Sequence, residues 1–355
     1  MLLDFWKNKK VLIIGHTGFV GGWLAQILLL KGANISGIAL KPTNKYYLFN
    51  LLDLKKKISN YFCDINNFSK LNKIISKINP EIIFHFASQS LVSAGYEKSI
   101  QTFDTNVRGT INILESCRLQ KKIKSLLVMT SDKCYQNNEK KYFFTEEYPL
   151  GGDDPYSASK ACQEIIVNSY KKSFFNKKIG ISTVRAGNII GGADWAENRL
   201  IVDIVKSYHK NKTLFLRNPN AIRPWQHVFD VLNGCMLLAK KMYISPNNFS
   251  SAWNFGPSKN KINEFATVEK ILNKINNYFP KKIKIQIIKS QYREKKNLFL
   301  NSNKSKKFLG WQKVLDLNSS LKLTLDWYLY FIKNKEKNAI SNYTNKQINS
   351  FFKII

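Results

Sequence analysis

The stretch Lys10-Val11-Leu12-Ile13-Ile14-Gly15-His16-Thr17-Gly18-Phe19-Val20-Gly21 decides the fold of this chain. Its first five residues form a short, mainly apolar run, which is typical of a buried parallel strand. An apolar pattern with helical spacing follows the glycines and stops at Gly32. Strand, glycine turn and helix in this order predict a dinucleotide-binding unit. Glycines permit the tight turn and let backbone N–H groups approach a pyrophosphate, which the start of the helix also favours.

Further strands are expected at 35–40, 82–86 and 126–129, and they alternate with helices up to about Val184. This alternation predicts an α/β fold with a doubly wound parallel sheet. Beyond Gly187 the pattern is irregular and rich in loops. We expect late helices near 268–278 and 321–333 and a packed or frayed tail, which together form a smaller C-terminal substrate-binding region.

Composition excludes several classes of protein. The chain has 355 residues, 44% of them hydrophobic, enough for a large core and one or two domains. No stretch approaches the roughly 20 continuous apolar residues of a membrane span, and no signal peptide is evident. Five cysteines without a CxxC pair indicate reduced thiols and a cytoplasmic protein. Four scattered histidines suggest no metal site.

The net charge of +32 raises the possibility of nucleic-acid binding. The lysines, however, are spread along the chain in short clusters, and no nucleic-acid-binding motif accompanies them. We therefore expect a solvated basic surface and no nucleic-acid partner. Such a surface can attract an anionic small molecule such as a nucleotide sugar.

A second group of polar residues follows the strand expected at 126–129. Ser131, Asp132 and Lys133 place a hydroxyl, a carboxylate and an amine at its carboxyl end, where open α/β sheets bind ligands. Downstream, a helix that opens at Pro155 puts Tyr156 and Lys160 one turn apart on one face. A lysine near a tyrosine favours the phenolate, which is a general base for an alcohol about to lose hydride.

The glycine spacing, GxxGxxG, resembles the short-chain dehydrogenase/reductase superfamily. That resemblance implies a bound NAD, although Leu40-Lys41 stands where an acid would contact the NAD ribose, which leaves NADP open. It also implies an NAD-binding domain over 1–186 plus about 226–257, and a nucleotide-sugar-binding domain over 187–225 and 258–355. The residues that would contact the cofactor are Gly15, Thr17, Gly18, Phe19, Val20, Gly21, Asp64, Ile65, Phe86, Ala87, Ser88, Asn106, Tyr156 and Lys160.

Several motifs together are similar to the CDP-glucose 4,6-dehydratases, an extended branch of that superfamily. They are Gly15 to Phe19, Thr130 to Tyr135, Gly151 to Lys160, Arg185 to Asn188, Arg217 to Pro219, Ile222 to Val228 and Trp253 to Pro257. The Ser-Asp-Lys triplet distinguishes the CDP-glucose enzymes from related dehydratases. The dTDP-glucose and GDP-mannose dehydratases have a similar triplet that carries Glu at the position of Lys133.

The resemblance implies a redox-neutral reaction on CDP-glucose, within deoxysugar biosynthesis for a lipopolysaccharide O-antigen. Tyr156, assisted by Lys160, would take the proton of the 4-hydroxyl, which Ser131 hydrogen-bonds. Asp132 would protonate the departing 6-hydroxyl, and Lys133 would take the C5 proton. Lys133 can act so only as a neutral amine, and Asp132 only as an acid with a raised pKa, so the two can titrate as a coupled pair.

Six residues are predicted to contact the substrate. Arg223 is the best candidate for a diphosphate clamp, because a guanidinium matches phosphate oxygens in a bidentate manner. The resemblance adds further substrate-binding residues: Gln89, Asn188, Arg199, Arg217 and Tyr292. The segment from Leu91 to Tyr96 lacks an arginine that the family pattern would place there, so the base and the hexose stay open.

Three functions are compared. The leading one is a CDP-glucose 4,6-dehydratase; the second is a dehydratase or 4-epimerase for another nucleotide sugar, which as an epimerase would not need Asp132 and Lys133. The third is a role without enzymatic activity, as a basic NAD-binding scaffold or a nucleic-acid binder. Members of the extended family are often dimers, so we expect a homodimer or a dimer of dimers, with no membrane partner.

Overall fold

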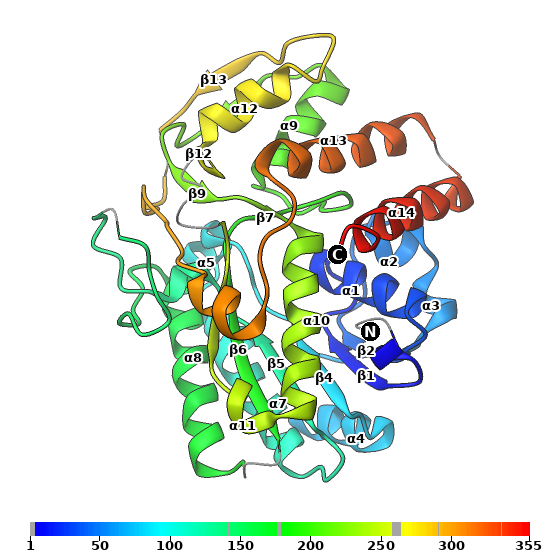
Figure 1. Ribbon diagram of the computed structural model, residues 1–355. Helices are drawn as coiled ribbons and strands as arrows, with labels where there is room; N and C mark the ends of the chain where they lie inside the picture. The colour runs from blue at the N-terminus through cyan, green and yellow to red at the C-terminus, as the bar shows by residue number, and fades with distance from the viewer. Residues whose placement is uncertain (1–3, 141, 176–178, 258–263, 290, 335) are drawn as a thin grey trace.

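Seven parallel strands form the central sheet of the computed structural model, which describes residues 4–140, 142–175, 179–257, 264–289, 291–334 and 336–355 (Figure 1). The order across the sheet is β11-β6-β5-β4-β1-β2-β3. The strands are β1 (Lys10–Ile14), β2 (Asn34–Ala39), β3 (Ser59–Phe62), β4 (Ile82–His85), β5 (Ser125–Met129), β6 (Gly180–Ala186) and β11 (Ala252–Phe255). The predicted α/β fold with a doubly wound parallel sheet is confirmed.

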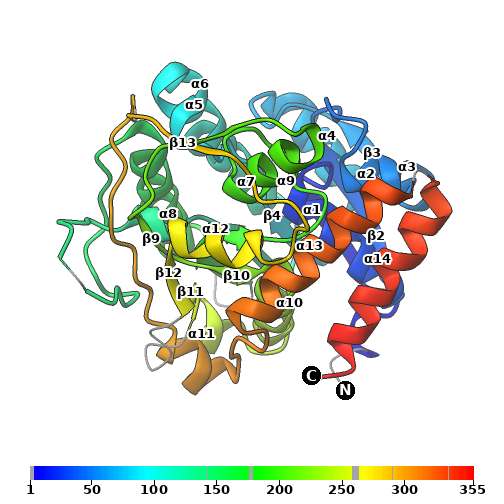
Figure 2. The ribbon, with the colours of Figure 1, turned by 90° about the horizontal axis from the view of Figure 1, so that it is seen from above.

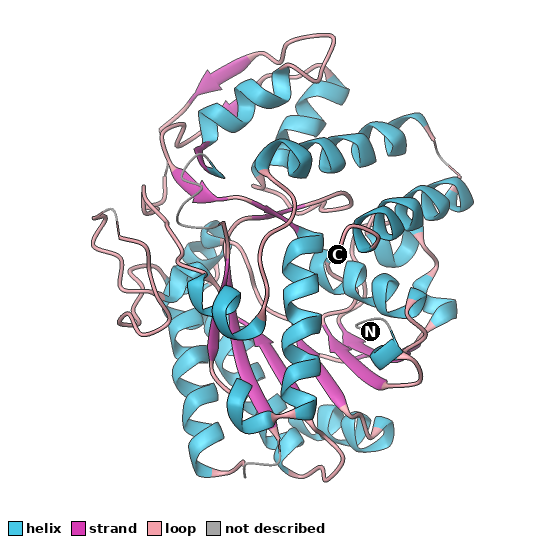
Figure 3. Cartoon of the chain, in the orientation of Figure 1, coloured by secondary structure: helices cyan, strands magenta, loops and turns pink. Residues whose placement is uncertain are grey.

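Helices cover both faces of this sheet (Figure 3). Alternate side chains of each strand point to opposite faces. Val11, Ile13 and Phe84 pack with α1 (Phe19–Leu30) and α10 (Val228–Ile244) in the larger core. Leu12 and Ile83 pack in a second core with α4 (Phe68–Ile78), α7 (Gly109–Arg118) and α8 (Pro155–Ser173). Burial on both faces explains why these strands are almost continuously apolar.

A group of short strands and helices lies beyond the carboxyl ends of the sheet strands (Figure 2). The short strands pair as β7 (Ile189–Ile190) with β10 (Gln226–His227), β8 (Leu214–Leu216) with β13 (Ile285–Ile287), and β9 (Ile222–Pro224) with β12 (Phe265–Thr267). The longer helices are α9 (Leu200–Lys210), α12 (Val268–Asn276) and α13 (Leu317–Lys333). This group faces the sheet where the predicted catalytic residues stand.

The remaining elements are short, apart from the last helix. They are η1 (Asp4–Trp6), α2 (Leu48–Leu51), α3 (Leu54–Lys57), α5 (Val92–Glu97), α6 (Ser99–Phe103), the π-helical turns η2 (Asp104–Arg108) and η5 (Ser305–Leu309), η3 (Asp132–Cys134), α11 (Pro246–Phe249) and α14 (Lys337–Phe352). Within the described residues, no helix combines the length and the apolar character needed to cross a membrane.

The predicted domain boundaries fall on a chain that passes three times between its two parts. Strand β11 pairs with β6 and so returns residues after 226 to the central sheet. The tail does not stay with the substrate-binding part, because α14 lies beside α2, and Gln26 of α1 donates a hydrogen bond of 2.7 Å to Asn345 (Figure 1). The division at 186, 226 and 257 stays a prediction.

Candidate active site

A cavity of about 250 Å³ opens beyond the carboxyl ends of β5 and β6. Its wall combines side chains from stretches that lie far apart in the chain, from Ser90 to Tyr328. The polar residues that line it include Ser131, Asp132, Lys133, Tyr156, Asn188, Arg199, Arg217, Arg223 and Glu294. The structure thus brings four of the five predicted catalytic side chains to one cavity, and the fifth, Lys160, lies behind Tyr156.

The turn after β5 aims the Ser-Asp-Lys triplet into this cavity. Ser131 is extended and caps the short helix η3, because its hydroxyl accepts a hydrogen bond of 3.2 Å from the backbone N–H of Lys133. The same hydroxyl donates to Oδ1 of Asp132 at 3.1 Å. Asp132 is 3% exposed, and its second carboxyl oxygen has no hydrogen-bond partner. Burial raises the pKa of Asp132, although Lys133 opposes this, so the shift is in the direction that a general acid needs.

Helix α8 positions the tyrosine and the lysine from its first turns. Asp154 caps the helix by accepting a hydrogen bond of 3.0 Å from the backbone N–H of Ser157, and Pro155 starts it. The two functional residues, Tyr156 and Lys160, are both buried. Burial raises the pKa of Tyr156 to about 12 and lowers that of Lys160 to about 7.

Lys160 lies near the phenol ring of Tyr156. Its Nζ lies 5.9 Å from the centroid of the Tyr156 ring and donates a hydrogen bond of 3.4 Å to the carbonyl of Met129. Burial raises the pKa of Tyr156 and outweighs a side-chain hydrogen bond with Ser131, which acts to lower it. The spacing predicts that Tyr156 and Lys160 lie side by side on α8, and the structure places them so; their roles as general base and helper stay predictions.

A buried polar network supports these residues from behind. Glu164, one turn after Lys160, pairs with Arg185 of β6 at 2.8 Å, and accepts hydrogen bonds from the hydroxyls of Thr130 and Thr183. Because Thr130 directly precedes Ser131, the network ties the carboxyl end of β5 to α8. It fixes the two elements that carry the reacting groups relative to each other.

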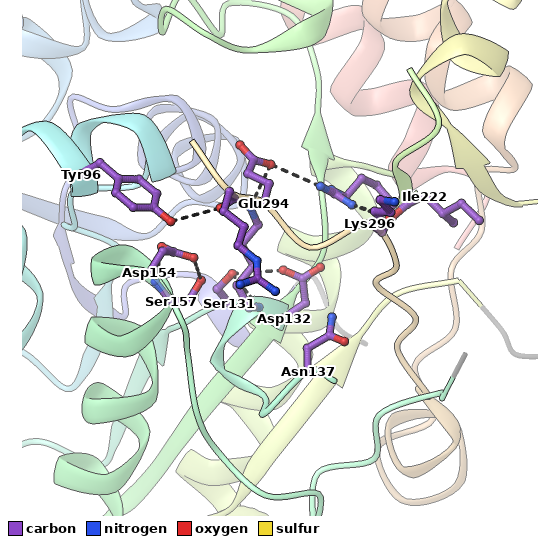
Figure 4. Close-up of polar contacts among 12 residues, drawn as sticks. Tyr96, Ser131, Asp132, Asn137, Asp154, Ser157, Ile222, Glu294 and Lys296 are labelled. Atoms are coloured by element: carbon purple, nitrogen blue, oxygen red, sulfur yellow. Dashed lines mark hydrogen bonds and ion pairs between the residues drawn. The ribbon is translucent and has the colours of Figure 1, made fainter. Parts of the chain in front are cut away.

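Sequence reasoning missed Glu294. Its Oε2 lies 3.5 Å from Nζ of Lys133 and 3.2 Å from Nη2 of Arg223 (Figure 4). Arg223, predicted as a diphosphate clamp, is 4% exposed, lines the cavity and also donates to the carbonyls of Ile222 and Lys296. Glu294 stands in the charged run from Tyr292 to Lys296, which from sequence alone looks like a solvated surface, so no spacing signal marked it.

The glycine turn has the tight geometry that a dinucleotide diphosphate requires. Gly15 has a φ of +100°, and a Cβ there would lie 2.7 Å from the backbone N of Ala87. A Cβ on Gly21 would lie 2.2 Å from the carbonyl oxygen of Gly15. Only glycine fits at both positions, so the backbone N–H groups at the start of the twelve-residue helix α1 stay accessible to an anion.

The other predicted cofactor residues surround this turn. Thr17 donates a hydrogen bond of 3.1 Å to the carbonyl of Leu40 at the end of β2. Segment 86–88 follows β4, and Asn106 within the π-helical turn η2 binds the backbone of Gln89 and the hydroxyl of Ser159. Asp64 is exposed, and Ile65 is buried at the end of the neighbouring β3. The residues present therefore fit a dinucleotide across the carboxyl edge of β1, β2 and β4.

Two predicted substrate residues do not line the main cavity. The side-chain amide of Gln89 donates a hydrogen bond to the hydroxyl of Thr102 and accepts one from the backbone N–H of Leu91. Tyr292 donates to Glu97 at 2.8 Å and lines an adjoining hollow instead. Their roles stay predictions. Within the described residues, no group of histidine, cysteine and acidic side chains could hold a metal ion.

Comparisons with known proteins show which family the chain resembles. The family model for GDP-mannose 4,6 dehydratase matches residues 12–324. CDP-glucose 4,6-dehydratase from Salmonella typhimurium is 38% identical over 96% of this chain and 97% of its own length. UDP-glucose 4-epimerase from Mycoplasma genitalium is 28% identical over 66% of this chain and 72% of its own.

Solved structures show the same fold at lower identity. UDP-glucuronic acid 4-epimerase from Bacillus cereus, in complex with UDP-glucuronic acid and NAD, superimposes with a TM-score of 0.78 at 20% identity, covering 90% of this chain and 98% of its own. An epimerase from Methanothermobacter thermautotrophicus gives a TM-score of 0.82 at 18% identity, covering 94% of this chain and 97% of its own.

Proposed function

Because the chain belongs to the GDP-mannose 4,6-dehydratase family, we propose that it is a nucleotide-sugar 4,6-dehydratase that converts CDP-glucose to CDP-4-keto-6-deoxyglucose. The observation that carries the proposal is the convergence of Ser131, Asp132, Lys133 and Tyr156 on one cavity in a chain so similar to a CDP-glucose 4,6-dehydratase. The enzyme is then an NAD-dependent hydro-lyase.

NAD fits the glycine cradle. Backbone N–H groups after Gly18 would hold the diphosphate, and the segment 86–88 would line the adjoining wall. When bound, NAD accepts hydride from C4 of the sugar and later returns it to C6, so no net redox change occurs. Lys41 at the end of β2 offers no carboxylate to a ribose hydroxyl, so the preference over NADP comes from the family and not from this residue.

The chain's own residues divide the proton transfers. Tyr156 takes the proton of the sugar 4-hydroxyl, and Lys160 favours the phenolate that this requires. Once C4 is a ketone, the C5 proton is acidic and passes to the amine of Lys133. The electron pair left at C5 forms the C5–C6 double bond as the C6–O bond breaks, and the proton of Asp132 completes the departing water. When C6 regains hydride, Lys133 gives its proton back to C5, which completes the 4-keto-6-deoxy sugar.

The test follows product and cofactor together. Purified protein with CDP-glucose and NAD should form a 4-keto-6-deoxy product without accumulation of NADH. Lys133→Ala should keep C4 oxidation but lose dehydration, so that NADH accumulates up to one equivalent per site. Absence of turnover, or only stoichiometric NADH with the wild type, would contradict the proposal.

The second candidate is a dehydratase or 4-epimerase for another nucleotide sugar. It is favoured by the missing arginine in the segment 91–96 and by the 4-epimerases among the relatives. Thermal stabilisation by CDP-, dTDP-, GDP- and UDP-sugars separates the substrates, because a ligand that binds only the folded state raises Tm. An epimerase would also tolerate Lys133→Ala.

We further propose that the enzyme is a cytoplasmic homodimer that serves deoxysugar synthesis for a lipopolysaccharide O-antigen. The cysteines among the described residues are unpaired, as expected in a reducing compartment. On α8, Ile165 is 57% exposed, whereas Ala161 is buried and Ile166 packs against the sheet. A face of α7 and α8 that includes Ile165 therefore suits a partner subunit. Ile165→Glu should yield monomers in sedimentation velocity, and unchanged dimers would contradict this.

A further inference from the structure

The segment Tyr292–Asn297, here called the strap, runs past the cavity between α5 and β9 and is anchored at both ends. At one end, the hydroxyl of Tyr292 donates to Oε1 of Glu97 at 2.8 Å. At the other, the carbonyl of Lys296 accepts a hydrogen bond of 2.8 Å from the backbone N–H of Ile222. The two anchors lie on separate elements, and Figure 4 shows Glu294 of the strap together with the second anchor, Lys296 and Ile222.

Glu294, in the middle of the strap, faces two cations across the cavity wall. Its carboxylate lies 3.5 Å from Nζ of Lys133 and 3.2 Å from Nη2 of Arg223. Burial acts to raise the pKa of Glu294, but Lys133 and Arg223 outweigh it, and the pKa falls below its ordinary value. The group is therefore an anion at neutral pH, within ion-pair distance of the amino group of Lys133.

The other titratable groups near Lys133 do not replace this carboxylate. Asp132, on the same turn, accepts a hydrogen bond from Ser131 and has a pKa that burial raises, and Tyr156 of α8 is neutral at physiological pH because its pKa is about 12. From α5, Tyr96 is also neutral, since burial raises its pKa. Asp153 is paired with Lys295 of the strap. Among the described residues, Glu294 is thus the ion-pair partner that the structure provides for Lys133.

We propose that Glu294 is a positioning residue for Lys133: its carboxylate holds the amino group at the cavity wall and sets the pH above which that group is free to accept a proton. The proposal rests on the proposed function, because the proton that Lys133 accepts is the C5 proton of the sugar. After the transfer, the ammonium group pairs with the carboxylate of Glu294 until it returns the proton to C5, as C6 regains hydride.

The decisive variant is Glu294→Gln, which keeps the size and an acceptor oxygen but removes the charge. Without the anion, the neutral amine persists to lower pH, so the acidic limb of kcat/KM is expected to move down by about one pH unit. Glu294→Asp keeps the charge, so the acidic limb of its kcat/KM profile should lie close to that of the wild type. Glu294→Ala, which also loses the acceptor, should lower the plateau kcat further than Glu294→Gln does.

A direct titration of Lys133 makes the test independent of turnover. Trace labelling with acetic anhydride modifies only the neutral amine, and mass spectrometry of the peptide gives its extent at each pH. The midpoint for Lys133 should fall by about one unit in Glu294→Gln. Glu97→Gln, which removes a carboxylate from the other anchor of the strap, is the matched control and should leave the midpoint in place.

The outcomes are distinct. An unchanged labelling midpoint in Glu294→Gln overturns the inference, whatever the enzyme does with CDP-glucose. An equal shift in Glu97→Gln also overturns it, because loosening of the strap would then explain the change. A wild type that labels as expected but does not convert CDP-glucose defeats the proposed function and leaves the pairing of Glu294 with Lys133 supported.

Discussion

The buried pair between Arg185 and Glu164 offers a quantitative test of the structure. The two charged atoms lie 2.8 Å apart, and the side chains are 4% and 3% exposed. At an effective dielectric constant of about 20, the gross attraction is about 6 kcal/mol. Desolvation offsets part of it, yet removal of one partner leaves an uncompensated buried charge, which typically costs about 3–5 kcal/mol. We expect Arg185→Met to lower the free energy of unfolding by that amount.

Urea-induced unfolding of four proteins measures this effect: the wild type, Arg185→Met, Glu164→Gln and the double variant. The double variant leaves no unpaired charge, so it should be more stable than the sum of the single losses predicts, by about 0.5–3 kcal/mol. The control is Arg118→Met, which breaks a surface pair with Glu115 at 2.7 Å and should cost less than about 1 kcal/mol. Additive losses, or an Arg185→Met variant as stable as the control, would refute the reasoning.

Three further predictions concern catalysis, packing and pH. Tyr156→Phe keeps the ring but loses the proton acceptor, so formation of the 4-keto product should slow by about 10²–10⁴-fold, and a loss below tenfold would contradict the role. In Gly37→Ala the added Cβ would lie 2.3 Å from the ring of His16, so the free energy of unfolding should fall by about 1–3 kcal/mol. Urea unfolding measures this fall, and an unchanged urea midpoint would contradict the close packing of His16 on Gly37. Burial lowers the pKa of His85 and of His227 to about 3, so the folded state leaves both neutral while the unfolded state binds protons below about 6.5. The contribution of these histidines to the free energy of unfolding is therefore full above that pH. On acidification toward pH 5 it falls by about 1.4 kcal/mol per pH unit for each histidine, which urea unfolding at several pH values measures. A urea midpoint that stays constant from pH 7 to pH 5 would show that the rings are not buried as described.

Much of the fold was predictable because its signals are local. The strand at 10–14, its glycine turn and the helix after it follow from apolar runs and glycine positions, and the structure confirms them. The helix expected from Leu321 begins four residues earlier, at Leu317, because Asp316 caps it by accepting a hydrogen bond from Ser319. Such a cap lies outside the apolar period that the sequence displays.

The site was predictable only where the chain itself brings residues together. Tyr156 and Lys160 share a helix, and Asp132 and Lys133 share a turn, so their proximity follows from spacing. Glu294 reaches Lys133 from 161 residues away, through a strap without regular secondary structure. Neither periodicity nor a motif reports a contact of that kind, because it depends on where the substrate-binding part folds back over the sheet.

The position of β11 at the edge of the sheet has a consequence for synthesis on the ribosome. Strand β6 emerges first, but its outer neighbour is not translated until residues 187–251 have been made. During that interval the nascent sheet presents an open row of backbone donors and acceptors on β6, the kind of edge onto which another chain can add. Translation speed across this stretch, or a chaperone that shields the edge, should therefore govern the yield of native enzyme.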